Sequence, residues 1–135
     1  MAGKLQFDLV TPERSLASLE ASEVLIPGGE GEMTAMEGHA PTITVLKTGT
    51  LRVVGSDGAV QSYVVTGGFA EISAESITVL AERAIPYEEA TGTVMDAVVA
   101  EARSLHDAAM EQDKDMAGKN LADAVALRDQ LLAAH

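Results

Sequence analysis

The sequence predicts a β-sandwich of about eight to ten short, mostly antiparallel strands, followed by an antiparallel hairpin of two α-helices. Two observations indicate this fold class. Up to residue 85, short β-branched or alternating runs are separated by Gly, Pro, Asp or Ser at intervals of about ten residues. After residue 85, apolar residues instead recur every three or four positions, as they do on one face of a helix. We therefore expect two domains, at 1–85 and 86–135.

The first predicted strand is KLQFDLV, in which Leu5, Phe7 and Leu9 share one face. Asp57-Gly58 predicts a tight hairpin turn of the primed type, because such turns require a positive φ. We interpret 67–68 (Gly-Gly) and 37–39 (Glu-Gly-His) as further turns or bulges. The other strands are expected in SLASLEASEVLI, EMTAM, PTITVL, TLRVVGS, AVQSYVVT, GFAEIS and SITVLA.

The helical segment begins after Pro86. Thr93 is the expected N-cap of its first helix, with Asp96 three residues later, in a variant of the capping box. A polar stretch at 111–115 joins the helices, and Arg128 lies near the end of the second. The expected apolar positions are Val94, Met95, Val98, Val99, Ala102, Leu105 and Ala109 in the first helix, and Leu121, Ala124, Val125, Leu131 and Leu132 in the second.

Composition excludes several functional classes. The net charge of −12, with nine scattered Lys and Arg, argues against binding a nucleic acid, as does the scarcity of aromatic residues. Without cysteine there is no disulfide, thiolate metal site or thiol nucleophile. No apolar run approaches the roughly 20 residues that span a bilayer, and the first residues do not resemble a signal peptide. We expect no direct insertion into a membrane.

The stretch IPGGEGEMTAMEGHAP (26–41) contains the main candidates for a catalytic, phosphate-binding or metal-binding role. His39 is the obvious catalytic candidate, but no nucleophile pattern accompanies it, so we expect it to fix a turn before Pro41. A phosphate loop would need a lysine and a following helix, and this stretch has neither. The glutamates do not follow an EF-hand pattern. We therefore predict a rigid, exposed, acidic docking loop with no catalytic residue and no metal site.

Several stretches together resemble the epsilon subunit of F-type ATP synthase, whose mitochondrial homologue is called delta. They are IPGGEGEMTAMEGHAP (26–41), ITVLKTGTLRV (43–53), YVVTGGFAEIS (63–73) and ITVLAERA (77–84), followed by the helical hairpin. The resemblance covers nearly the whole chain in order, including the change from strands to helices.

The resemblance implies a non-catalytic rotor subunit of the central stalk. In this family the sandwich packs on the gamma subunit and sits on the ring of c subunits. The resemblance places one set of residues in the loops that face the polar loops of the c-ring. Carboxylates there would orient the contact more than strengthen it. The set is Glu30, Gly31, Glu32, Gly38 and His39.

In many bacterial relatives the hairpin inhibits ATP hydrolysis, and in some it binds ATP through the pattern Ile/Leu-Asp-x-x-Arg-Ala. Here Asp96 and Ala100 match, but Val99 replaces the arginine, and Arg103 lies one turn later as the only nearby substitute. Residues 86–135 contain ten acidic and four basic residues, a net charge of −6, which is poorly suited to acidic segments of the alpha and beta catalytic subunits. We expect no cofactor, and weak or absent inhibition.

The sequence thus predicts a subunit that couples gamma to the c-ring, held peripherally on the cytoplasmic side of a bacterial inner membrane. The alanine-rich, lysine-poor composition is typical of bacteria. One alternative is a regulatory subunit whose hairpin binds ATP and inhibits hydrolysis through the alpha and beta subunits. Another is a free-standing β-sandwich binding module, and a third is a hydrolase built on His39 and the glutamates.

Overall fold

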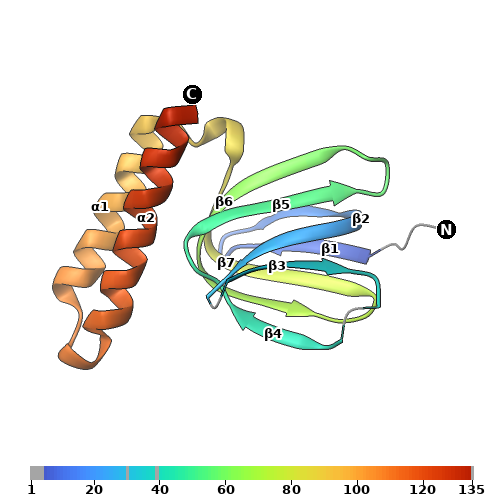
Figure 1. Cartoon of the computed structure of the whole chain (residues 1–135), viewed down its shortest axis with the longest axis horizontal. Coiled ribbons are helices and arrows are strands. Elements are labelled where there is room, and N and C mark those ends of the chain that lie inside the picture. Colours follow the sequence, from blue (N-terminus) through green and yellow to red (C-terminus); the bar gives the residue numbers. More distant parts are fainter. Residues whose placement is uncertain (1–4, 30, 39, 135) are drawn as a thin grey trace. The chain divides into compact units, whose positions relative to one another are not determined.

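The computed structural model describes residues 5–29, 31–38 and 40–134, and the chain divides into two compact units, Met1–Tyr87 and Glu88–His135. The first unit contains the strands and the second contains the helices (Figure 1). The division lies two residues beyond the boundary expected after residue 85. The predicted sandwich followed by a helical hairpin is confirmed.

Seven strands are described where eight to ten were expected. Two predicted segments, AVQSYVVT and GFAEIS, form one continuous strand instead of two. The strands are β1 (Leu5–Val10), β2 (Ser15–Gly28), β3 (Gly31–Met36), β4 (Thr42–Val45), β5 (Gly49–Gly55), β6 (Val60–Ile72) and β7 (Ser76–Pro86).

The sheet closes on itself through two long strands. β2 pairs with β1 along its first half and with β3 along its second half, while β5 lies on its other edge. β6 pairs with β5 through residues 60–65 and with β4 through residues 69–72, and β7 follows its other edge. β1 completes the ring by pairing with β7, and this is the one parallel pairing described. β2 and β6 therefore each belong to both layers of the sandwich.

Gly67 and Gly68 lie inside β6, so the expectation of a turn or bulge there is wrong. The register between β6 and β7 is the same on both sides of the pair, from Tyr63↔Pro86 to Ile72↔Ile77. Both glycines have positive φ, and a Cβ on Gly68 would overlap the carbonyl oxygen of Leu80. The glycines thus let β6 turn from one layer into the other without losing its partner.

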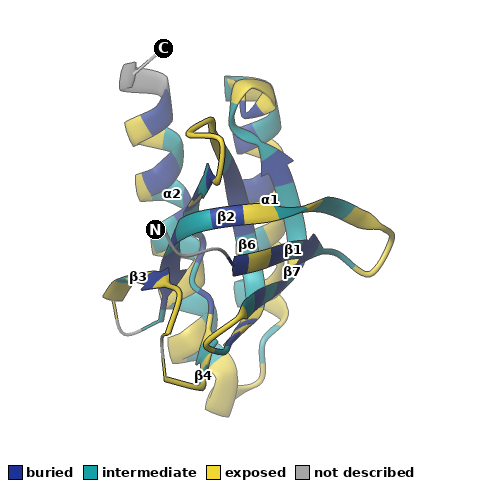
Figure 2. Cartoon of the chain, turned by 90° about the vertical axis from the view of Figure 1, so that its right-hand side faces the viewer, coloured by how far each residue is buried: buried dark blue, intermediate teal, exposed yellow. Residues whose placement is uncertain are grey.

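The core follows from alternation along the strands. Leu5, Phe7 and Leu9 are fully buried and their neighbours are not, as predicted, and the same alternation colours β1 in Figure 2. Burying a side chain of this size contributes roughly 1.5–3 kcal/mol. The other core residues are aliphatic or alanine, apart from the ring of Tyr63.

The hairpin between β5 and β6 is confirmed, but its turn is not of the primed type. Only Gly58 has a positive φ (+88°), whereas a type I′ turn would need a positive φ at Asp57 as well. The N–H of Gly58 donates to the carbonyl of Gly55 (2.9 Å), and Asp57 Oδ1 accepts from the N–H of Ala59 (2.9 Å). The aspartate therefore closes the turn with its side chain rather than with left-handed backbone.

The second unit is a hairpin of α1 (Gly92–Ala108) and α2 (Lys114–Ala134). The short 3₁₀ segment η1 (Tyr87–Glu89) precedes α1 at the boundary between the units, and η2 (Glu111–Asp113) precedes α2. The expected cap at Thr93 is wrong. The N-cap is Thr91, whose hydroxyl accepts from the N–H of Val94 (3.5 Å), so Thr93 lies within the first turn. The helix begins two residues earlier than expected because Gly92 enters it.

The apolar stripe of the hairpin differs from the predicted one at two positions. Met95, Val98 and Val99 are buried as expected, but Leu105 is 59% exposed. Leu127, which the sequence pattern did not single out, is buried together with Ala124 and Leu131. The pattern shows which residues can share a face, but the packing of the two helices decides where that face becomes covered.

The close approach at Gly68 yields a stability prediction. Gly68→Ala should lower the free energy of unfolding of the sandwich by more than about 3 kcal/mol, because left-handed strain is added to a clash with backbone. Gly58→Ala is the matched control, since Gly58 also has a positive φ but a Cβ there meets no atom within 4 Å. It should cost only about 1–2 kcal/mol.

Urea unfolding followed by tyrosine fluorescence measures the difference. Both tyrosines, Tyr63 and Tyr87, lie in the first unit, and the chain has no tryptophan. Equal losses in the two variants would show that the backbones of β6 and β7 do not depend on their contact at Gly68.

Candidate docking surfaces

The first part of the predicted docking loop is a β-hairpin. β2 and β3 pair up to Gly28↔Gly31, and Glu32 stands opposite Pro27 as an exposed residue of β3. Gly31 has φ +137°, which only glycine adopts readily, and a Cβ there would meet open space. The turn therefore presents Gly31 and Glu32 at one end of the sandwich on ordered strands.

Hydrogen bonds fasten this turn to β4. The N–H of Gly29 donates to the carbonyl of Val45 (2.7 Å), and the N–H of Lys47 donates to the carbonyl of Pro27 (3.0 Å). A further isolated bridge joins Gly28 to Leu46. The β2 arm of the turn is thus held between β3 on one edge and residues 45–47 on the other.

Gly38 lies at the opposite end of β3. It has φ +85°, and its N–H donates to the carbonyl of Ala74 (2.9 Å), beside the β6–β7 turn. Six strand residues separate it from the first turn, a span of roughly 20 Å. The strand expected at EMTAM is confirmed, but it divides the stretch 26–41 into two separate turns, so the expectation of a single docking loop is wrong and Gly31 and Glu32 are not brought together with Gly38.

Two of the predicted contact residues, Glu30 and His39, lie outside the described residues. Their expected role at the c-ring stays a prediction. Among the residues that the structure does describe, no group of three His, Asp or Glu side chains is placed to hold a metal ion. Within the same residues, no helix has the length and apolarity that crossing a bilayer requires.

The sequence pattern did not predict the apolar surface beside the first turn. Ile43, Val45 and Phe69 are 70%, 62% and 41% exposed. The alternating run PTITVL predicts a strand, and hydrophobicity would turn Ile43 and Val45 inward. Instead, Thr42 and Thr44 lie on the less exposed side of β4. Only the pairing of β4 with β6 reveals which face is buried.

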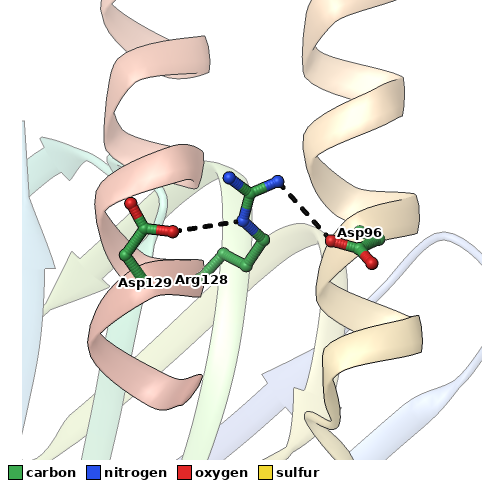
Figure 3. A network of polar contacts seen from close by, with 3 residues as sticks. All are labelled: Asp96, Arg128 and Asp129. Atoms are coloured by element: carbon green, nitrogen blue, oxygen red, sulfur yellow. Dashed lines mark hydrogen bonds and ion pairs between the residues drawn. The ribbon is translucent and has the colours of Figure 1, made fainter. Parts of the chain in front are cut away.

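The candidate nucleotide residues lie along α1. Asp96, Ala100 and Arg103 are all exposed, while Val99, at the arginine position of the pattern, is 2% exposed. Asp96 is engaged across the hairpin by α2. Its Oδ1 accepts from Nη1 of Arg128 (3.5 Å), and Arg128 Nε donates to Asp129 Oδ1 (3.3 Å), as Figure 3 shows.

This network brings one cation between two carboxylates. Because Asp96 and Asp129 are about two-thirds exposed, water screens the pairs, and each contributes less than about 1 kcal/mol. The network matters more for phosphate binding than for the stability of the hairpin. The guanidinium on α2 that lies nearest to Asp96 already has carboxylate partners, so an incoming phosphate would have to compete with them.

The family model and the similar proteins found by comparison all point to the same family. The family model described as ATP synthase, Delta/Epsilon chain, beta-sandwich domain matches residues 4–87. An ATP synthase epsilon chain of Cereibacter sphaeroides is 63% identical over 128 residues, which are 95% of this chain and 96% of that protein. The ATP synthase epsilon chain of Paracoccus denitrificans is 48% identical, over 98% of this chain and 86% of that one.

Two solved structures share the fold. A chain in the cryo-EM structure of the Euglena gracilis mitochondrial ATP synthase (OSCP/F1/c-ring) superposes with a TM-score of 0.70 at 25% identity, covering 98% of this chain and 81% of that one. A chain from the central stalk and c-ring of the Tetrahymena thermophila mitochondrial enzyme superposes with a TM-score of 0.63 at 16% identity. The coverage there is 94% of this chain and 95% of that one, and this likeness concerns the fold alone.

Proposed function

The chain belongs to the ATP synthase delta/epsilon family, and on that premise we propose that it is the epsilon subunit of a bacterial F-type ATP synthase. It is a non-catalytic part of the central stalk that couples the gamma subunit to the c-ring. The 63% identity over nearly the full length of an epsilon chain is the observation that carries this proposal. We propose further that it lies peripherally on the cytoplasmic side of the inner membrane, held there by the complex.

The turn between β2 and β3 is the proposed contact with the c-ring. Glu32 is exposed on an ordered strand, and the turn is fastened to β4 by the hydrogen bond from Gly29 to Val45. A carboxylate at such a rim steers and orients its partner, while the stiff sandwich transmits torque. Glu30 and His39, from the same sequence stretch, belong to the proposed contact on the family resemblance alone, and Gly38 would form a separate contact from the other end of β3.

The rotor role is tested by adding the chain back to membranes whose ATP synthase lacks it. The wild-type chain should restore proton-driven ATP synthesis. Glu32→Lys should restore it about two- to tenfold less well, because reversing a rim charge misorients the docked subunit. Glu20→Lys is the matched control, since Glu20 is exposed in the middle of β2, away from the turn. If the wild-type chain leaves synthesis unchanged, the coupling role is wrong.

The hairpin is proposed to have little inhibitory function. Its net charge of −6 opposes docking on acidic segments of the alpha and beta subunits. The contact between α1 and α2, with Met95, Val98 and Leu127 buried, favours the closed hairpin. The alternative is a regulatory hairpin that opens and blocks catalysis.

Removal of residues 88–135 separates these two roles. Because β7 ends at Pro86, the truncation leaves every strand of the sandwich whole. ATPase activity of the assembled enzyme should stay within about twofold of the full-length value. If the hairpin does not inhibit catalysis, its removal leaves the activation barrier of ATP hydrolysis unchanged. Co-purification of the truncated chain with gamma is the control for assembly. A several-fold rise in activity would demonstrate an inhibitory hairpin.

We also propose that the hairpin binds no ATP. Val99 is buried where the pattern has its arginine, and Arg128 is paired with Asp96 and Asp129. Calorimetric titration of the chain with ATP and Mg²⁺ should give no saturable heat, corresponding to a Kd weaker than about 1 mM. Asp96→Ala should give the same trace. Saturable heat in the wild-type chain that disappears in this variant would establish a nucleotide site.

A further inference from the structure

Two contacts show how α1 and α2 lie against each other. Oδ1 of Asp96, near the start of α1, accepts from Nη1 of Arg128 at 3.5 Å. Near the other end of α1, the ring of His106 lies beside Gly118, where an added Cβ would stand 3.5 Å from Cδ2 of the ring. We call the half around the first contact the base (92–101 and 124–131) and the half around the second contact the tip (102–123).

The buried side chains of the two helices lie in the base. They are Met95, Val98 and Val99 on α1, and Ala124, Leu127 and Leu131 on α2. In the tip, every residue of which is described by the structure, no residue is buried. The half-buried positions there include Ala102, Ala109, Ala117 and Gly118, which have little side chain to cover. Apolar burial therefore stabilises the base more than the tip.

The larger apolar side chains of the tip do not make up this difference. Leu105, Met110 and Met116 are 59%, 66% and 68% exposed, and Leu121 is half-buried. Gly118, within α2, also lowers the helical stability of the tip, because glycine loses more backbone freedom on folding than alanine does. Both helices are thus held less firmly in the tip than in the base.

A carboxylate oxygen at the border of the two halves also destabilises the closed tip. Asp123 precedes Ala124, the first buried residue of α2, and Oδ2 of Asp123 is buried without a hydrogen-bond partner among the described protein groups. A buried polar atom without a donor raises the free energy of the state that buries it. Separation of the helices in the tip would let water reach this oxygen.

A lysine side chain closes the connection between the helices. Nζ of Lys114, the first residue of α2, donates to the carbonyl oxygen of His106 (3.2 Å), which also accepts from the N–H of Ala109 (3.2 Å). The lysine thus satisfies a carbonyl group at the C-terminal end of α1. This bond holds the turn between the helices, and it adds no apolar contact between their facing sides.

We propose that the hairpin opens from its tip, so that residues 102–123 separate and unwind while the base stays closed. Lengthening the connection from 109–113 to 102–123 is about two doublings of loop length, and each doubling costs little entropy. Release of the whole of α2 from α1 would require the base to break as well. This inference goes beyond the proposed function, because it concerns the order in which the hairpin opens and not the subunits that the chain contacts.

Amide hydrogen exchange of the full chain, followed by NMR, tests the order of opening. Relative to unfolded-chain rates, amides 103–108 and 118–121 of the tip should exchange at least about tenfold faster than amides 98–101 and 124–131 of the base. Equal protection of the two halves, or faster exchange in the base, would overturn the proposal.

Two reciprocal substitutions give the matched comparison. Gly118→Ala should slow exchange of the tip amides about two- to fivefold, since alanine favours the helix and its Cβ makes ordinary contact with His106. Ala126→Gly makes the reverse change at an exposed position of the base. It should speed up exchange of the base amides about two- to fivefold and leave the tip amides at the wild-type rate, because the tip opens while the base is closed.

The effect of Ala126→Gly on the tip is decisive. If this variant speeds up exchange equally in both halves, the hairpin opens as one unit and the proposal is wrong. Amides of β6 and β7 should keep their wild-type exchange rates in both variants, which verifies that the sandwich is intact.

Discussion

The sandwich depends on two long strands that each belong to both layers. β6 achieves this at Gly67 and Gly68, and at Gly68 its backbone approaches Leu80 so closely that no Cβ fits. β2 achieves it by exchanging β1 for β3 along one edge. Because every pairing in the ring is retained through these crossings, the seven described strands enclose one aliphatic core. Side chains fill that core to the density of a solid, and this makes the unit stiff.

This construction also places the two candidate surfaces. The exchange of partners along β2 puts the β2–β3 turn at one end of the sandwich, with Glu32 exposed. The exchange along β6 puts β4 beside the second half of that strand, so Val45 and Phe69 become neighbours on the outer face. The hydrogen bond from Gly29 to Val45 then joins the turn to this exposed apolar surface. A polar surface and an apolar surface are thereby held on one rigid body.

Alternation was enough to predict the sandwich and the burial of Leu5, Phe7 and Leu9. In a strand with one buried face, every second residue is buried, so the apolar pattern of the sequence shows directly which residues those are. It could not predict that Gly67-Gly68 continues a strand, since only the partner β7 shows that the register is kept. It also could not tell which face of β4 is covered, and there threonines point inward while Ile43 and Val45 are exposed. The pairing of Asp96 with Arg128 depends on the register of two helices, which no local pattern encodes.

The proposed role requires one stiff sandwich to contact two different partners, gamma and the c-ring, at different places on its surface. The chain has no cysteine, so a single cysteine can be introduced at exposed position 32 or 69 and coupled to a photo-activated cross-linker in the assembled enzyme. We expect the cross-linker at position 32 to capture the c subunit and the one at position 69 to capture gamma. Capture of the same subunit from both positions, or exchange of the two partners, would show that the proposed contacts are wrong.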